Sequence, residues 1–270
     1  MNGRIFERKK NALIFQPRDA EILKSVFRYR FLIGEQIKSL CGFSSQKRTN
    51  DRLRKLFDNR FLSRRLFING FDKEVLYFLG PKSIEFISAQ TGIDPLKVKR
   101  KRTKSLKARD SFLFHLLFIN NFRYCLETAK GFNPKAGIET WKYKPALFSN
   151  EEKKIFPDAY FRIKHQEKDY NFFLEIDHST ESGKRIKKKV ESYLDYGLSG
   201  DFEKQFGFTY FRLLIVSKTL VRLKSLLRTI EKVTDKSFFW LTIEKNISPE
   251  KISDKIWSRS NANGLFSLLE

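Results

Sequence analysis

Three carboxylates stand beside two apolar segments of the chain, where they are placed for metal chemistry. Asp158 immediately precedes one apolar segment, and Glu175 and Asp177 stand two residues apart in the next. Side chains alternate along a β-strand, so these two acids face one side while Leu174 and Ile176 face the other. Carboxylate oxygens are ligands that Mg²⁺ accepts. The three acids therefore form a candidate magnesium site.

The segments around these acids alternate between strand and helix patterns. A long helix is expected over Leu106–Thr128, followed by two helices over Glu181–Gly197 and Leu220–Val233. The expected strands are Gly137–Tyr143, Phe156–Ile163, Tyr170–Ile176, Tyr210–Val216 and Phe238–Ile243. This order predicts an α/β domain in which helices cover a central mixed sheet.

The composition points to a polyanionic partner. The 270 residues carry a formal net charge of +23 and a pI of about 10.0, as is typical of nucleic-acid-binding proteins. A basic ribosomal-type or membrane-surface protein is the alternative. Aromatic residues make up 15% of the chain, including 28 Phe, so a substantial core can form and a disordered basic tail is excluded.

Cysteine and histidine usage argues against a disulfide framework or a zinc site. The two cysteines, Cys41 and Cys125, lie in apolar helical patterns and are expected to be buried free thiols in a reducing compartment. His115 lies among apolar residues and is interpreted as a core histidine. His178 follows the acidic strand, where it is either a metal ligand or proton shuttle, or a hydrogen-bonded residue at the strand end. The N-terminus has no secretory signal, and no apolar stretch can span a bilayer, so we expect a cytoplasmic protein without a membrane partner.

The N-terminal part has the pattern of a winged helix-turn-helix. Asn69-Gly70 between two apolar runs is a strong hairpin signal, and Ser44 or Ser45 can cap the helix before it. The predicted elements are helices at Pro17–Arg28, Gly34–Leu40 and Gln46–Asn59, hairpin strands at Phe61–Ile68 and Glu74–Leu79, and a further helix at Pro81–Gln90.

The third of these helices has the residues of a DNA-reading helix. In a helix-turn-helix the N-terminal residues of this helix enter the major groove, where Arg and Lys pair with guanine and Asn and Gln with adenine. The predicted contacts to double-stranded DNA are Gln46, Lys47, Arg48, Asn50 and Arg54, with Arg64 and Arg65 of the wing on phosphates. The alternative is a solvated helix in a winged domain that binds protein.

A run of basic residues predicts the boundary between two domains. Like charges repel and resist packing, so residues 97–104 are interpreted as a basic linker. The domains are then 1–96, a winged helix-turn-helix, and 105–270, an α/β domain. Lys99, Arg100, Lys101 and Arg102 of the linker are expected to contact DNA phosphates.

The acidic strands resemble the PD-(D/E)xK nuclease superfamily. This resemblance implies that Asp158 and Glu175 are catalytic acids that bind Mg²⁺ beside a lysine. Asp177 stands where that lysine is expected, and a carboxylate cannot stabilise the developing negative charge. Lys189 and Tyr193 resemble the Gln-x-x-x-Tyr motif of RecB-like members, with Lys in place of Gln, so Lys189 is a candidate relocated catalytic lysine. The alternative is a lysine that neutralises a buried acid cluster.

The order of these segments resembles the replication-relaxation family of plasmids and mobile elements. The resemblance covers about residues 17–245 and is carried by TNDRLRKLFDNRFLSRR, HLLFINNFR, FPDAYFRI, FLEIDHSTE and KKKVESY. It implies a DNA-binding accessory protein of replication or mobilisation with a degenerate nuclease-like domain, acting with replication or relaxase proteins or as a homodimer. The alternatives are a Mg²⁺-dependent DNA endonuclease using Asp158, Glu175 and Lys189, and a protein-interaction hub in a replication or relaxase complex.

Overall fold

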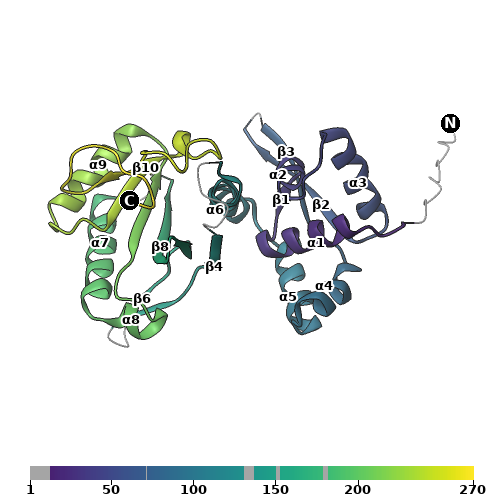
Figure 1. The fold of residues 1–270 in the computed structure, drawn as a ribbon, viewed down its shortest axis with the longest axis horizontal. Coiled ribbons are helices and arrows are strands. Elements are labelled where there is room, and N and C mark those ends of the chain that lie inside the picture. Colours follow the sequence, from purple (N-terminus) through teal and green to yellow (C-terminus); the bar gives the residue numbers. More distant parts are fainter. Residues whose placement is uncertain (1–12, 71, 131–136, 150–152, 179–181) are drawn as a thin grey trace. The chain divides into compact units, whose positions relative to one another are not determined.

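A computed structural model describes residues 13–70, 72–130, 137–149, 153–178 and 182–270 (Figure 1). The chain divides into two compact units, residues 1–120 and 121–270, which are described separately. The boundary falls inside the long helix α6 (Asp110–Thr128). Within the described ranges, no helix is long and apolar enough to cross a membrane.

The first unit starts with helices and a small antiparallel sheet. Its three strands pair in the order β1–β3–β2, and the β2–β3 hairpin extends away from the helices (Figure 1). The helices and the hairpin lie close to their predicted bounds, and β1 was not predicted. The elements are α1 (Pro17–Tyr29), β1 (Leu32–Ile33), α2 (Gly34–Leu40), α3 (Gln46–Asp58), β2 (Leu62–Asn69) and β3 (Asp72–Leu79).

Local sequence explains where α3 starts and how the hairpin ends. The Ser45 hydroxyl accepts the Arg48 backbone N–H at 3.3 Å and caps the helix. Buried Leu53 and Leu56 fix the inward face of α3. Gly80 follows β3 where the chain passes close to residue 60, so that a Cβ would lie 2.3 Å from the Arg60 carbonyl oxygen. Only glycine fits there without a backbone shift.

A buried ion pair joins α1 to α3. Asp19 has no exposed surface, and Arg52 Nε donates to its Oδ1 at 2.6 Å. The Arg52 Nη2 group also donates to the second oxygen of Asp19, which makes the pair bidentate. Asp19 additionally accepts the backbone N–H of Gln16 at 2.8 Å, one residue before α1 begins. The pair sets the position of α3 against the helix that supports it.

The basic segment expected to be a linker is a helix. The unit continues with α4 (Ser83–Thr91) and α5 (Pro95–Leu106), and α5 contains the whole run 97–104. Val98 and Ser105 stand seven residues apart on its inner face and are both buried, while most of its cations are exposed. The predicted linker and the domain boundaries at 96 and 105 are therefore wrong. Repulsion among the cations is relieved by solvent on one helix face, and the opposite face still packs.

The second unit is built on a six-stranded mixed sheet in the order β11–β10–β9–β8–β7–β4. Strands β8, β9 and β10 are parallel, and the remaining neighbours are antiparallel. The predicted central mixed sheet is confirmed. Its strands are β4 (Gly137–Tyr143), β7 (Ala159–His165), β8 (Lys168–Asp177), β9 (Arg212–Ser217), β10 (Phe239–Ile243) and β11 (Ser258–Arg259).

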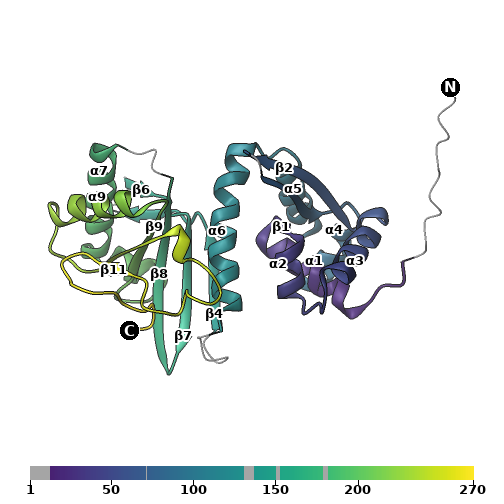
Figure 2. The ribbon, with the colours of Figure 1, turned by 90° about the horizontal axis from the view of Figure 1, so that it is seen from above.

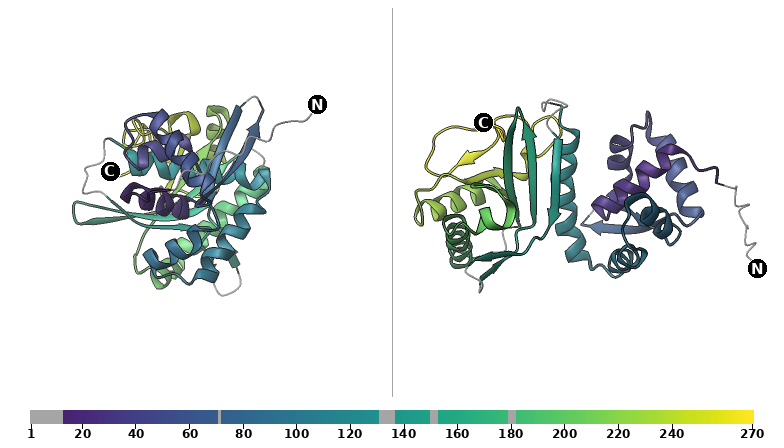
Figure 3. Two further views of the ribbon diagram at one scale, coloured as in Figure 1. Left: turned by 90° about the vertical axis from the view of Figure 1, so that its right-hand side faces the viewer. Right: turned by 60° about the horizontal axis from the view of Figure 1, so that its bottom comes forward.

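Helices cover both faces of this sheet (Figures 2 and 3). On one face, α7 (Gly183–Leu198) and α9 (Leu220–Glu231) pack on the aromatic cluster around Phe173. On the other, the end of α6 places Phe122 against Phe161, with ring centroids 5.8 Å apart. Alternate residues of β7 and β8 therefore enter two separate cores, which explains their nearly continuous burial.

Several short elements of the second unit were not predicted. These are β5 (Leu147–Ser149), β6 (Lys153–Ile155), α8 (Asp201–Phe206), the 3₁₀ helix η1 (Glu244–Asn246) and β11. Both cysteines are free thiols. Cys125 is buried as expected, whereas Cys41 is half-buried at the end of α2. Burial raises the pKa of Cys41 to about 11 and that of Cys125 to about 12, so both stay protonated at neutral pH.

Candidate functional site

The N-terminal half of α3 presents polar and basic side chains on its outer face. Gln46, Lys47, Arg48 and Asn50 are exposed, while Thr49 between them is buried. Gln46 Nε2 donates to Asn50 Oδ1 at 2.9 Å, so these two amides form one exposed unit. A donor and an acceptor remain available on such a pair for the edge of a base. Base reading by these residues stays a prediction.

A groove of about 620 Å³ lies between α3, the start of α2 and the β2–β3 hairpin. The Arg64 guanidinium lies over the Phe57 ring, 4.3 Å from its centroid, which holds it at this groove. Arg54 forms an exposed ion pair with Asp51 at 3.3 Å. The groove carries charges of both signs: Arg54, Arg64 and Lys73, and Glu35, Asp51 and Glu74. Its acids oppose a purely electrostatic contact and favour a ligand that also offers hydrogen-bond donors.

Arg65 has a structural partner. Its Nη2 donates to Asp110 Oδ1 at 2.7 Å, and its Nη1 donates to the carbonyl oxygen of Ala108 at 2.5 Å. Both bonds fix the turn between α5 and α6. These bonds use two of the five N–H donors of Arg65, and its expected phosphate contact stays a prediction.

The four cations expected in the linker have different surroundings on α5. Lys99 and Arg100 are exposed. Lys101 Nζ donates to the Phe27 carbonyl oxygen at 2.5 Å and lies 4.1 Å from the centroid of the Phe27 ring. Burial, reinforced by nearby Arg60, lowers the pKa of Arg102. Lys99 and Arg100 are therefore better placed for a ligand than Lys101 and Arg102.

In the second unit, Glu175 is the centre of a buried polar cluster. Tyr193 Oη donates to its Oε1 at 2.6 Å, and Lys189 Nζ donates to its Oε2 at 3.2 Å. Both donors project from α7 at positions i and i+4, which share a helix face. Burial raises the pKa of Glu175; Lys189 opposes this rise, and nearby Asp158 adds to it. The predicted reach of Lys189 toward the acids is confirmed.

Asp158 joins the ends of β7 and β8. Its Oδ2 accepts the Ile176 backbone N–H at 2.9 Å, and its own backbone N–H donates to the Leu174 carbonyl oxygen at 2.9 Å. The side chain is therefore held beside Glu175 by the edge of the strand. In the β7–β8 ladder Ala159 pairs with Leu174, and the backbone bond of Asp158 continues this pairing by one residue.

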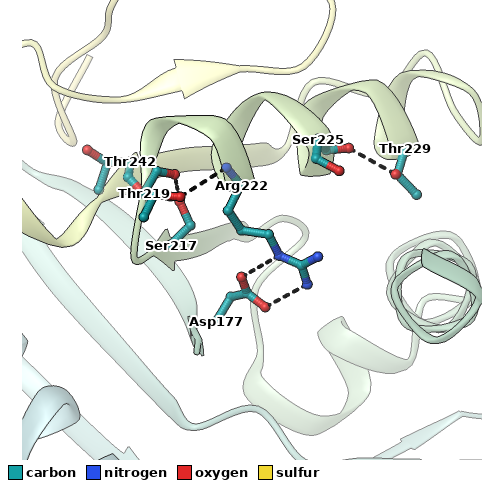
Figure 4. Close-up of polar contacts among 7 residues, drawn as sticks. All are labelled: Asp177, Ser217, Thr219, Arg222, Ser225, Thr229 and Thr242. Carbon is teal, nitrogen blue, oxygen red and sulfur yellow. Dashed lines mark hydrogen bonds and ion pairs between the residues drawn. The ribbon is translucent and has the colours of Figure 1, made fainter. Parts of the chain in front are cut away.

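Asp177 binds an arginine that the sequence analysis did not single out (Figure 4). Arg222 Nε donates to Asp177 Oδ2 at 2.8 Å, and Nη2 donates to Oδ1 at 3.0 Å. The Thr219 hydroxyl caps α9 by accepting the Arg222 backbone N–H at 3.2 Å. This bond fixes the position of the Arg222 backbone in the first turn of the helix. No spacing in the sequence connects residues 177 and 222, since they meet only because α9 packs on the sheet.

These contacts do not fit a magnesium site. Both oxygens of Glu175 accept hydrogen bonds, and both oxygens of Asp177 face a guanidinium. Among the described residues, no group of three or more His, Cys, Asp or Glu side chains is placed to hold a metal ion. These contacts oppose a metal shared by Asp158, Glu175 and Asp177, and that metal site, like a ligand role for His178, stays a prediction. The three acids do face one side of the sheet, but Lys189 pairs with Glu175 and Arg222 with Asp177, while Asp158 accepts a backbone N–H.

The chain belongs to the replication-relaxation family, whose sequence model matches residues 23–210. No curated protein sequence matches it. Among solved structures, it is similar to the restriction endonuclease FokI, with 12% sequence identity and a TM-score of 0.33. That similarity covers 87% of this chain and 45% of the FokI chain, so the chain spans less than half of FokI. A TM-score at this level does not establish a shared fold.

Proposed function

We propose that this protein binds double-stranded DNA in the cytoplasm as an accessory factor in the replication or mobilisation of plasmids or other mobile elements. The first unit is a winged helix-turn-helix in this proposal, with α3 in the major groove and the β2–β3 hairpin as the wing. The observation that carries it is the exposed row Gln46, Lys47, Arg48 and Asn50 on a capped helix. Membership of the replication-relaxation family and the charge of +23 support it.

The two DNA-facing surfaces have separate roles in this proposal. The amide pair of Gln46 and Asn50, with Arg48, reads base edges, and Arg64 of the wing binds a phosphate. A good bidentate base contact contributes about 1–3 kcal/mol of discrimination. Asn50→Ala should therefore weaken binding to the preferred sequence while leaving random DNA almost unaffected. Arg64→Ala should weaken binding to both DNAs by a similar factor.

Fluorescence anisotropy tests this division with a duplex selected from a random-sequence library and a shuffled duplex of equal length. Lys224→Ala is the matched control, because it removes one exposed charge from α9 in the other unit. If Asn50→Ala and Arg48→Ala lose equal affinity for both duplexes, the assignment of α3 to the major groove is wrong. A weak salt dependence would oppose the electrostatic part, since log K should fall by about 0.9 per log unit of salt for each phosphate neutralised.

We further propose that the second unit is a nuclease-like domain that does not cleave DNA. The hydrogen-bonded Glu175 and the Asp177–Arg222 pair support this, since neither carboxylate is free for Mg²⁺. One observation favours the endonuclease alternative: Lys189 lies 3.2 Å from Glu175, where a catalytic lysine would be useful. Nicking of supercoiled plasmid with Mg²⁺ or Mn²⁺ separates the two. Metal-dependent nicking that disappears in Asp158→Ala would establish the endonuclease.

A further inference from the structure

A cationic groove lies on the first unit, away from the residues assigned to base reading. Its volume is about 780 Å³, and it is formed by α5, the turn into α6 and Arg30 at the end of α1. Six cations line it: Arg30, Lys99, Arg100, Lys104, Lys107 and Arg109. None of its lining residues is acidic. This charge distribution differs from that of the α3 groove, where acids and cations are mixed.

Within the described part of the chain, none of these six cations forms an ion pair. The adjacent cations behave otherwise, since Arg65 pairs with Asp110 and Lys101 binds a carbonyl oxygen. Burial lowers the pKa of Arg30, whose Nε donates to the Ser105 hydroxyl at 3.0 Å. Six uncompensated cations repel one another, and an anion in the groove would relieve that repulsion.

The groove also has an apolar floor between its cations. Leu96 lines the groove and is 60% exposed. The Arg30 guanidinium lies over the Phe112 ring, with its Cζ 4.7 Å from the ring centroid. A guanidinium stacked on an aromatic ring gives a flat platform for another planar group. Exposed apolar surface beside fixed positive charge is what single-stranded nucleic acid binds, with its phosphates on the cations and its bases against the apolar surface.

We propose that this groove binds single-stranded nucleic acid. A duplex would contact the same cations, but its bases are stacked on each other and cannot reach Leu96 or Phe112. A free nucleotide has the same chemistry on a smaller scale, with one base and one phosphate group. The site is distinct from α3, so the proposal does not depend on base reading by that helix. A protein with both sites holds a duplex through α3 and an opened strand through α5.

The test measures binding of fluorescent oligothymidine, about 15 nucleotides long, since single-strand-binding folds cover about 4–16 nucleotides. Lys99→Ala with Lys104→Ala removes two groove charges. Lys224→Ala with Lys232→Ala removes two exposed charges from the region of α9 and is the matched control. Each phosphate contact on a single strand contributes about 0.7 to the salt slope, so the groove variant should lose about 1.4 and the control almost nothing.

A second variant tests the apolar floor without changing charge. Leu96→Ala should weaken oligothymidine binding by about threefold, as expected for roughly 30 Å² of lost apolar contact. The same variant should leave binding of a hairpin duplex unchanged. Leu96 is exposed, so the fold should survive, and an unaltered melting temperature checks this.

Three results would overturn the proposal. Equal salt slopes for wild type and the Lys99/Lys104 variant would show that the groove does not bind the strand. Equal losses on oligothymidine and duplex for Leu96→Ala would assign the groove to duplex backbone. Displacement of oligothymidine by an equimolar amount of ATP would make it a nucleotide pocket. Weaker binding of the preferred duplex by Asn50→Ala, with oligothymidine binding retained, would confirm that the two sites are separate.

Discussion

The buried ion pair between Asp177 and Arg222 can be tested by removing one partner. The side chains are only 6% and 18% exposed, and two N–H···O bonds of 2.8 and 3.0 Å join them. Arg222→Met keeps an unbranched apolar stem but removes the guanidinium, which leaves Asp177 as a buried carboxylate without this cation. Such a loss costs about 3–5 kcal/mol.

The same change should be visible as a fall in melting temperature. In a unit of this size, 1 kcal/mol shifts the melting temperature by roughly 2–4 °C, so the unit should melt about 6–20 °C lower. Asp177→Leu combined with Arg222→Met removes both charges and should recover most of the loss, because replacing a buried pair by apolar residues is often nearly neutral. Urea denaturation of the wild type, the two single variants and the double variant gives the coupling energy.

Two results would refute this reasoning. A loss below about 1 kcal/mol for Arg222→Met would place the pair among weak surface contacts. Additive losses in the double variant would mean that the two residues are not coupled. Addition of Mg²⁺ supplies an independent check. We expect no rise in the stability of the wild type, whereas a metal-stabilised wild type would return Asp177 to the candidate ligands.

Three further predictions concern the other buried charges. Asp19→Ala should destabilise the first unit by about 3–5 kcal/mol, because it leaves Arg52 without its buried partner; Asp51→Ala, which removes an exposed pair, is the control and should change little in the same urea titration. Because burial raises the pKa of Glu175, the folded state favours the neutral carboxyl group, and this contribution to stability is present at acidic pH. It is lost as pH rises through the raised pKa. Urea midpoints measured against pH should show this loss in the wild type and not in Glu175→Gln. Supercoiled plasmid should stay intact with Mg²⁺ or Mn²⁺ for both the wild type and Asp158→Ala, and wild-type cleavage above background would contradict this.

Local sequence patterns were sufficient for most of the elements that carry the candidate sites. The Asn69-Gly70 turn predicted the hairpin, and Ser45 before a helical pattern predicted the start of α3. The alternation in β8 placed Glu175 and Asp177 on one face of the sheet. These predictions succeeded because they depend on residues near one another in the chain, where turn geometry, capping and strand periodicity act.

The basic run in α5 shows how such a pattern can mislead. Its charge density suggested a linker, but Val98 and Ser105 are spaced to bury one face. Two inward residues in twelve give a weak apolar pattern, because the long stems of Lys and Arg complete the contact. The helix was recognisable only once the surface that it packs on was known.

The sequence by itself determined the strand that carries the acids, the helix that carries Lys189 and Tyr193, and the family resemblance that the chain's membership confirmed. Tertiary structure decided which cation neutralises which carboxylate. Arg222 reaches Asp177 from 45 residues away, and Lys189 reaches Glu175 from 14, because α7 and α9 pack on the same face of the sheet. A buried charge is stabilised by whichever group lies within a few ångströms of it, and that distance is set by packing between elements, not by separation along the chain.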